Sequence, residues 1–460
     1  MPVYRPKFRM EFYSIPATFA GFLLVLPAIW LLLSKFHLHT QLKQQSTTNP
    51  NPMPFRAAVL GVPEIRKASP SIILPQENNR ENYFAFCPHS QTHWESDWRN
   101  VIVPFMTSPE YGFHELPHTL NMTKPVHFWF TENSIPKSLA KANNTHFIIN
   151  SIGARSSLCI GGSKDEQLNC RKSYFQKFGC KFEDFPIQSR QIQLSSKDDC
   201  KSFFSTEPND KERLYIVKKT RSSGGHGIDI FQGLDTIRLK YGKCEYSRPL
   251  IIMDYIDKPA LLNGNKFDFR TYLLVASLKP RLVFYHDGLV RRANLPYNTS
   301  LFSNRNIHIT NAKTQNRLDQ YYFNLNEILS NLLISPEKII EKMKSLSKVL
   351  FLSSNAHSYE GRFHLFGIDW MLDEKFNLYL LEVNRNPIIS THYEALRPPT
   401  IWKDMLDLVL LVHTKKSEED IRSEMLVRNN FTFKGWELIF NEMESPLHLE
   451  NPCNEMHKVW

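Results

Sequence analysis

Four strongly apolar, β-like runs follow one another in the middle of the chain, and they constrain its fold more than any other feature. LYIVKK, PLIIMDYI, FDFRTYLLVAS and RLVFYHDG lie between residues 214 and 288. Two more runs, FHLFGIDWMLD and LYLLEVN, are separated by the polar turn DEKFN. Short runs of β-branched and aromatic residues bounded by turns are typical of strands. We therefore expect a protein built around β-sheets.

Helical segments alternate with these strands. KDEQLNCRKSYFQKFG reads as a helix that closes at Gly179, and SPEKIIEKMKSLSKVLFLS has Ser335 as N-cap and Pro336 in its first turn. PPTIWKDMLDLVLLVHT has the spacing of an amphipathic helix. Strands mixed with helices, without an internal repeat, favour an α+β sandwich.

A long apolar segment stands near the start of the chain. Residues 12–34 carry no charge, and about 23 residues of helix are enough to span a bilayer. We predict a single transmembrane helix here, followed by a flexible stem. Three cations precede the span, so the positive-inside rule slightly favours a lumenal body.

Charge and cysteine content narrow the partners. The net charge of +10 favours an acidic partner. No long block of Lys and Arg and no zinc-finger spacing is present, which argues against nucleic acid. None of the seven cysteines forms a C-x-x-C pair, so zinc and thioredoxin-type chemistry are poorly supported. Buried thiols and disulfides both remain open.

A glycine-rich loop follows the first strong strand. In LYIVKKTRSSGGHGIDIF the strand ends near Lys218, and Gly224, Gly225 and Gly227 lie in the loop. Glycines let backbone N–H groups approach phosphates, and a lysine adds positive charge. A phosphate site is one interpretation and a plain hairpin loop is the other.

Charged residues begin the strand that contains KFDFR. Side chains alternate along a strand, so Lys266, Asp268 and Arg270 share one face. Burying such a row is unfavourable unless it meets charges of a ligand or partner, although a solvated edge strand would also hold it. The preceding run ends in MDYI, whose backbone could meet an adenine edge while Ile256 packs on the ring.

Polar residues also interrupt the last two apolar strands. Asp369 lies within LFGIDWML, and Glu382 and Asn384 share one face of LYLLEVN. Oxygen ligands converging from paired strands suit Mg²⁺ and leave coordination positions for phosphate oxygens. We predict a magnesium site at these three residues.

In their order, these segments resemble the tubulin–tyrosine ligase family of ATP-grasp enzymes. The resemblance rests on IVK, the glycine-rich loop, MDYI, KFDFR, YHDGLVR, HITN, FGIDW and LLEVN, and covers roughly residues 145–410. It implies an α+β ATP-grasp fold in which two β-rich layers clamp the nucleotide. It also implies ATP and Mg²⁺ as cofactors, a small amino acid as co-substrate, and tubulin as an acidic protein acceptor.

The resemblance further implies a role for each matching residue. Catalytic residues would be Arg270, Arg291 and Glu382. Nucleotide-binding residues would be Lys218, Gly224, Gly225, Gly227, Met253, Asp254, Tyr255, Ile256, Lys266, Asp268 and Asn311. Metal ligands would be Asp369, Glu382 and Asn384. Lys164, similar to a lysine that begins an earlier helix in the family, is a further candidate.

Domain boundaries follow from these segments. We expect a short tail (1–11), a transmembrane anchor (12–34), a flexible stem (35–55), an irregular N-terminal region (56–145), the ligase-like ATP-grasp domain (146–415) and a C-terminal extension (416–460).

The predicted function is an ATP-dependent ligase that joins an amino acid to a carboxylate of an acceptor protein through an acyl-phosphate. Met253 and Arg385 depart from the family pattern, which usually has Gln and a small residue there. They motivate an alternative, a membrane-anchored nucleotide-binding protein without ligase activity. A ligase acting on a lumenal, non-tubulin protein is another, because a tubulin ligase would need a cytoplasmic body.

Overall fold

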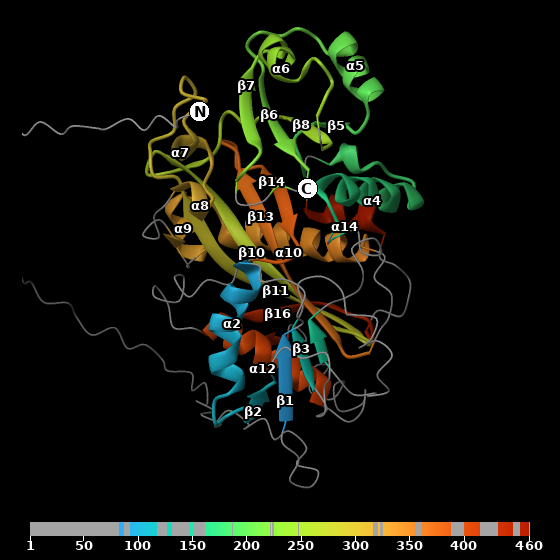
Figure 1. Ribbon diagram of the computed structural model, residues 1–460, viewed down its shortest axis with the longest axis vertical. Helices are drawn as coiled ribbons and strands as arrows, with labels where there is room; N and C mark the ends of the chain where they lie inside the picture. Colours follow the sequence, from blue (N-terminus) through green and yellow to red (C-terminus); the bar gives the residue numbers. More distant parts are fainter. Residues whose placement is uncertain are drawn as a thin grey trace, which may run out of the picture. The chain divides into compact units, whose positions relative to one another are not determined.

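Two β-sheets and the helices packed on them make up the described part of the protein (Figure 1). The computed structural model describes residues 82–86, 93–116, 127–130, 148–150, 160, 162–185, 187–220, 222, 225–246, 248–315, 321–322, 325–354, 360–387, 400–414, 431–444 and 451–459. All of them belong to one compact unit, Ser69–Trp460.

The smaller sheet is antiparallel and carries the glycine-rich loop. Its strand order is β5-β8-β6-β7. The strands are β5 (Gln191–Leu194), β6 (Leu214–Lys219), β7 (Ile228–Gln232) and β8 (Leu250–Asp254). Helices α5 (Lys197–Thr206) and α6 (Leu234–Tyr241) contribute Phe203 and Ile237 to a core shared with β6 and β8. A disulfide between Cys200 and Cys244 joins α5 to the turn after α6.

The larger sheet has twelve strands among the described residues. Its main order is β15-β16-β11-β10-β13-β4-β3-β1-β2, while β12, β14 and β9 pair with β11, β13 and β10. The strands are β1 (Asn82–Phe86), β2 (Phe113–Glu115), β3 (Phe128–Phe130), β4 (Ile148–Asn150), β9 (Leu261–Leu262), β10 (Asn265–Leu278), β11 (Arg281–Arg292), β12 (Tyr321–Tyr322), β13 (Arg362–Leu372), β14 (Leu378–Asn384), β15 (Thr432–Phe433) and β16 (Trp436–Asn441).

Apolar side chains cover both faces of this sheet. Along β10, Phe269 and Leu273 belong to one core cluster, and Tyr272 and Leu274 belong to another. Helices of the first cluster are α4 (Lys164–Lys177), α9 (Leu325–Asn331), α10 (Pro336–Leu352) and α14 (Pro452–Val459). Helices of the second are α2 (His93–Met106) and α12 (Thr400–Thr414). The remaining short turns are η3 (Phe182–Asp184), α7 (Arg305–His308) and α8 (Ala312–Gln315). Burial on both faces explains why β10 is almost continuously apolar from Tyr272 to Leu278.

The predicted elements of the body are present. Strands occupy the six apolar runs, Ser335 is the N-cap of α10 with Pro336 at its first position, and α4 ends just before Gly179, which has a φ of +80°. A positive φ is a usual way for glycine to end a helix.

Two regions contain more regular structure than their sequences indicate. The region expected to be irregular holds α2 and the strands β1, β2 and β3, two of which have only three residues. The C-terminal extension supplies β16, which pairs with β11, and α14, which packs on α10. Strands this short carry no readable alternation, so the sheet that recruits them decides their conformation.

The predicted membrane anchor, residues 12–34, lies outside the described residues. Within the described part of the chain, no helix is long and apolar enough to cross a membrane. A span needs about 20 consecutive apolar residues, whereas the longest described helix, α10, has 17 and is amphipathic. The expected anchor and membrane partner therefore gain no support from the structure.

A disulfide between Cys180 and Cys453 fastens the C-terminal helix to the loop after α4. The two cysteines are 273 residues apart in the sequence. On α14, Met456 is fully buried in the core beside them. The bond thus closes residues 180–453 into one covalent loop.

Replacing Cys453 with alanine should lower the free energy of unfolding by about 2–5 kcal/mol, because the unfolded chain loses a long-range constraint. Urea unfolding in non-reducing buffer measures this difference. In reducing buffer both proteins lack the bond, so their difference should vanish. Equal stabilities in non-reducing buffer would contradict the pairing.

Candidate functional site

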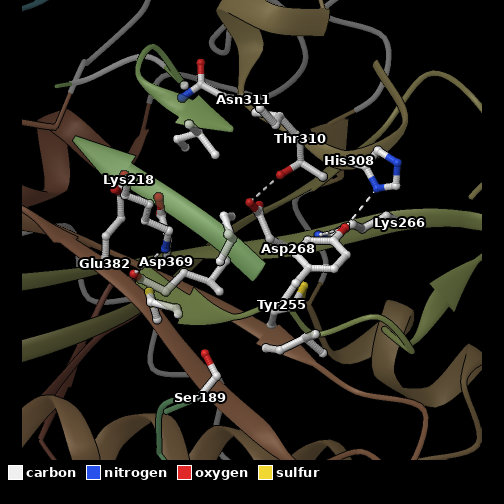
Figure 2. A pocket seen from close by; sticks show the side chains of 18 of the residues that line it. Ser189, Lys218, Tyr255, Lys266, Asp268, His308, Thr310, Asn311, Asp369 and Glu382 are labelled. Atoms are coloured by element: carbon white, nitrogen blue, oxygen red, sulfur yellow. Dashed lines mark hydrogen bonds between the residues drawn. The ribbon is translucent and has the colours of Figure 1, made fainter. Parts of the chain in front are cut away.

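A pocket with an empty volume of about 870 Å³ lies where the two sheets face each other. Its walls come from β6, β7 and β8 of the smaller sheet and from β10, β11, β13 and β14 of the larger one. Of the predicted site residues, those that line it are Lys164, Lys218, Gly225, Met253, Asp254, Tyr255, Ile256, Lys266, Asp268, Arg291, Asn311, Asp369 and Glu382. Figure 2 shows Lys218, Asp369 and Glu382 at one end of the pocket, with Tyr255, Lys266 and His308 at the other.

Strand register brings the acidic residues together. Asp369 on β13 pairs directly with Glu382 on β14, so the two side chains lie on the same face of the sheet. Asn384 Nδ2 donates to Asp369 Oδ2 at 3.3 Å and to Glu382 Oε1 at 3.0 Å. Lys164 Nζ, from the first residue of α4, lies 3.0 Å from Glu382 Oε2. The three predicted metal ligands therefore meet at one point.

Buried arginines continue this cluster into the larger sheet. Arg270 pairs in register with Asp369 and donates to it from Nε and from Nη2, the latter at 2.9 Å. Arg291 donates to both oxygens of Asp268 at 2.6 and 2.7 Å, and its Nη2 is 3.1 Å from Asp369 Oδ2. Positive and negative groups thus alternate through the cluster, which compensates the cost of burying each of them.

Gly288 gives Arg270 its position. The register between β10 and β11 shifts between Arg270 and Tyr272, and Gly288 on β11 has a φ of +65° at this irregularity. A Cβ atom at Gly288 would lie 2.0 Å from the Arg270 carbonyl oxygen. No other residue fits there without moving the backbone that carries Arg270.

Burial and neighbouring charges shift the pKa values of Lys218 and Glu382. Burial lowers the pKa of Lys218 to about 8, with a contribution from the nearby Lys164. Burial acts to raise the pKa of Glu382, but Lys164 and Lys218 outweigh it, so the pKa is well below its usual value. Glu382 is consequently a carboxylate at any physiological pH.

A second lysine ends a buried chain of hydrogen bonds. Lys266 Nζ donates to the Tyr255 hydroxyl at 3.0 Å, and this hydroxyl lies 2.9 Å from His308 Nδ1. His308 Nε2 lies 3.1 Å from the Leu301 carbonyl oxygen. Burial lowers the pKa of His308 to about 4 and that of Lys266 to about 7. If His308 is neutral, donates to the Leu301 carbonyl and accepts from the Tyr255 hydroxyl, every polar group in this series of hydrogen bonds has a partner.

The segment predicted to meet an adenine ring borders the apolar part of the pocket. Met253 and Ile256 line it together with Ile216, Met371 and Leu381. The carboxylate of the intervening Asp254 is occupied elsewhere, because Arg213 donates to its oxygens at 3.1 and 2.8 Å. A flat apolar ligand suits this wall.

The glycine-rich loop approaches the pocket at one of its predicted glycines. Gly225, with a φ of +78°, lines the pocket, and Arg305 of α7 donates to its carbonyl oxygen. Gly227 has a φ of +69° and accepts a backbone hydrogen bond from Lys219 at 2.9 Å, so it closes the hairpin instead of lining the pocket. Gly224 lies outside the described residues.

Two predicted residues do not line the pocket: Arg270 contacts it through Asp369, and Asn384 contacts it through Asp369 and Glu382. Residues that line the pocket without having been predicted are Ser189, Ile216, Ser222, His226, Ile228, His308, Ile309, Thr310, Met371 and Leu381. Thr310 donates to Asp268 (Figure 2), and His308 ends the lysine chain. Both belong to the motif HITN, in which only Asn311 was predicted from the sequence as a site residue. The whole motif was the sequence signal that could have pointed to His308 and Thr310.

The donor set is compatible with a hard divalent cation. Its two carboxylates are the ligand type that Mg²⁺ prefers. Asn384 turns its amide nitrogen toward both of them, so its oxygen would reach a cation only after the amide rotates. Among the described residues, no group of three or more His, Cys, Asp or Glu side chains could hold a metal ion. Lys164 and the two arginines presently balance the acidic charge, so a cation entering here would compete with Lys164 for Glu382.

A comparison of the sequence with models of protein families identifies the family of the chain. A model described as the tubulin-tyrosine ligase family matches residues 162–421, more than half of the chain. The chain therefore belongs to the tubulin–tyrosine ligase family. Its mixture of helices with two sheets is consistent with the ATP-grasp-like fold expected for that family.

Characterised relatives match the same part of the chain. Tubulin monoglutamylase TTLL4 of Mus musculus is 30% identical over 259 residues, which are 50% of this chain and 21% of the mouse protein. Protein polyglycylase TTLL10 of Rattus norvegicus is 28% identical over 265 residues, 50% of this chain and 38% of the rat protein. Inactive polyglycylase TTLL10 of Homo sapiens is 25% identical over 312 residues, 60% of this chain and 45% of the human protein. The chain thus spans less than half the length of these relatives.

These relatives correct the predicted localisation. The sequence predicted a single-pass membrane protein whose body slightly favours the lumen. The mouse relative is named for modifying tubulin, and no helix in the described ranges can cross a membrane. The lumenal prediction depended on a small difference in flanking charge, which is a weak determinant of orientation. That prediction was wrong.

Replacing Asp268 with asparagine should lower the free energy of unfolding by about 3–5 kcal/mol, because Arg291 is left as a buried cation without its main counter-charge. Asp254→Asn is the matched control, since its side chain is 30% exposed and its loss should change stability by about 1 kcal/mol or less. Urea unfolding measures both. Equal effects of the two substitutions would show that the buried cluster contributes no more to the free energy of unfolding than a partly exposed ion pair does.

Proposed function

We propose that this protein is an ATP-dependent ligase that joins an amino acid to a carboxylate of an acceptor protein. The observation that carries the proposal is the direct pairing of Asp369 with Glu382 in a pocket that also holds Lys218 and Lys266. A magnesium–triphosphate complex needs cationic side chains next to its phosphate oxygens and carboxylates next to its metal ion. Membership of the tubulin–tyrosine ligase family supports the same conclusion.

The nucleotide would lie along the pocket, between the two sheets. The apolar wall of Ile216, Met253 and Met371 suits the adenine ring. Lys218 and Lys266, both buried, would neutralise phosphate oxygens. Asp369, Glu382 and Asn384 would hold Mg²⁺, which supplies charge neutralisation for the transferring phosphoryl group.

The reaction would proceed in two steps. A carboxylate oxygen of the acceptor attacks the γ-phosphorus, the bond to ADP breaks, and an acyl-phosphate forms. The amine of the amino acid then attacks the acyl carbon, the C–N bond forms, and inorganic phosphate leaves as the amine loses its proton. The role of the protein is to position these groups and balance their charge.

The two arginines differ in how they could contribute. Arg291 lines the pocket, binds Asp268 and Asp369, and has a side chain that is 7% exposed. Arg270 also binds Asp369 and its side chain is 12% exposed, but it does not line the pocket. Arg291 is therefore the better placed of the two to polarise the carbonyl oxygen of the acyl-phosphate, and Arg270 would act by holding Asp369 in place.

Tubulin is the acceptor that the relatives favour. Relatives named as a tubulin monoglutamylase and as a protein polyglycylase support glutamate or glycine as the added amino acid. The net charge of +10 also favours an acidic acceptor segment.

A second candidate function is nucleotide binding without ligation. Met253 stands where the family usually has Gln, and one human relative is named as an inactive polyglycylase. The complete set of Asp369, Glu382 and Asn384 favours the active ligase. Incubation with ATP, each labelled amino acid and tubulin separates the two functions.

Replacing Glu382 with glutamine should reduce ATP turnover at least about a hundredfold, because one anionic metal ligand is lost. Conversion of ATP to ADP in the presence of tubulin and an amino acid measures the effect, and circular dichroism checks the fold. The matched control is Glu374→Gln, an exposed carboxylate in the turn between β13 and β14. Wild-type ATP consumption by the Glu382 variant would overturn the metal assignment.

Nucleotide affinity should depend on pH through Lys266. Free Lys266 is a cation below pH 7 and mostly neutral above it, and bound phosphates raise its pKa. Affinity for MgATP should therefore fall about tenfold between pH 6.5 and 8.5, and binding above pH 7 should take up a proton. Calorimetry in buffers of different ionisation enthalpy measures this uptake.

Lys266→Arg is the control for this pH dependence, because arginine stays charged throughout the range. The variant should show a shallower dependence on pH and less proton uptake. An unchanged profile would mean that Lys266 does not face the phosphates.

A further inference from the structure

A second, smaller pocket adjoins the first. It has an empty volume of about 310 Å³ and shares Lys164, Lys218 and Glu382 with the main pocket. Its inner wall contains Arg171 of α4 and Gln191 at the start of β5. We call it the Arg171 pocket.

Arg171 is a buried cation without a carboxylate. It is 5% exposed, and it takes part in none of the ion pairs found among the described residues. Its Nη2 donates to the neutral Gln188 side chain at a long 3.3 Å, and its Nε has no acceptor. The other buried arginines of the site, Arg270 and Arg291, each bind an aspartate.

The surroundings of Arg171 do not remove this charge. Burial alone lowers its pKa, to about 10, so it remains protonated at neutral pH. The guanidinium carbon lies 5.5 Å from the centre of the Phe182 ring, a contact that favours a cation only weakly. An unpaired buried charge is strongly unfavourable, which indicates that a counter-charge belongs here.

Hydrogen-bond donors outnumber acceptors in this pocket. Gln191 Nε2 has no acceptor, and Lys218 Nζ reaches only the Leu381 carbonyl at 3.5 Å. Among the residues that line the pocket, Glu382 is the single carboxylate, and it already accepts from Lys164 and Asn384. A ligand that fits must supply acceptors, as an oxyanion does.

We propose that the Arg171 pocket is a carboxylate-binding subsite, and that it takes the α-carboxylate of the amino acid that the ligase adds. The location supports this source, because the wall formed by Lys164 and Glu382 is shared with the part of the main pocket assigned to phosphates and metal. A small amino acid held by its carboxylate there keeps its amine free to reach the acyl-phosphate. The inference rests on the proposed ligase function.

Arg171→Met tests the subsite, because methionine keeps length and apolar character but removes the charge. The KM for glycine or glutamate should rise at least about tenfold, with the KM for ATP unchanged. Lys172→Met is the matched control: it is the next residue of α4, pairs with Glu183 at the surface, and should leave both KM values unchanged. An unchanged amino-acid KM in the Arg171 variant overturns the assignment.

Gln191→Glu gives an independent test if the first variant does not fold. It introduces a carboxylate into the pocket that Arg171 also lines, so the pocket gains a counter-charge for the arginine. Thermal stability should rise while binding of the amino acid is lost. Unchanged stability together with unchanged amino-acid binding would show that the two side chains do not share a ligand site.

Calorimetry separates the sources of the anion and also separates this inference from the ligase proposal. Glycine, glutamate, acetate and inorganic phosphate are titrated into wild-type protein and into the Arg171 variant. Loss of glycine or glutamate binding in the variant supports the subsite even if no ligase activity is found with any acceptor. Loss of only acetate or phosphate binding, with amino-acid binding intact, overturns the assignment to the amino acid.

Discussion

The chain of alternating charges at the centre of the larger sheet is the interaction on which the rest of the site depends. Arg270 binds Asp369, which also binds Arg291, which in turn binds Asp268. The first and last links join residues of neighbouring strands and the Asp369–Arg291 link crosses β10, so correct strand register is needed for any of them to form. A slip by one residue would turn every one of these side chains to the opposite, apolar face.

The two sheets contribute different parts of the site. The smaller sheet supplies Lys218 and the glycine-rich loop, whereas the larger sheet supplies Lys266 and the carboxylates of β13 and β14. Each sheet has its own apolar core, and the smaller one is closed by its own disulfide. The pocket is therefore made where two independently packed bodies face each other, a usual place for ligand sites.

Much of the site could be predicted because its residues conflict with their local surroundings. Asp369 and Glu382 interrupt strands that are otherwise apolar, and KFDFR places three charges in front of a buried run. The strands themselves and the caps of α4 and α10 follow from equally local signals. Such conflicts can be read from the sequence without knowing which strands are neighbours.

Features that depend on distant contacts could not be predicted. Thr310 and His308 gain their roles only through Asp268 and Tyr255, which lie more than 40 residues away in the sequence. Arg171 lies in a helix of strongly polar composition, where an arginine normally faces solvent, and only the packing of α4 buries it. The three-residue strands near the N-terminus are recruited by a sheet whose centre is more than a hundred residues downstream.

Gly288 is informative for comparing this chain with related sequences. It does not line the pocket and carries no charge, yet a Cβ atom there would lie 2.0 Å from the Arg270 carbonyl oxygen, so not even a methyl group fits. Any substitution would displace the strand that presents Arg270. The absence of a side chain at this position is therefore as necessary for the site as the presence of its charged side chains. When related sequences are sorted into competent and degenerate copies, this glycine deserves the same weight as the acidic residues.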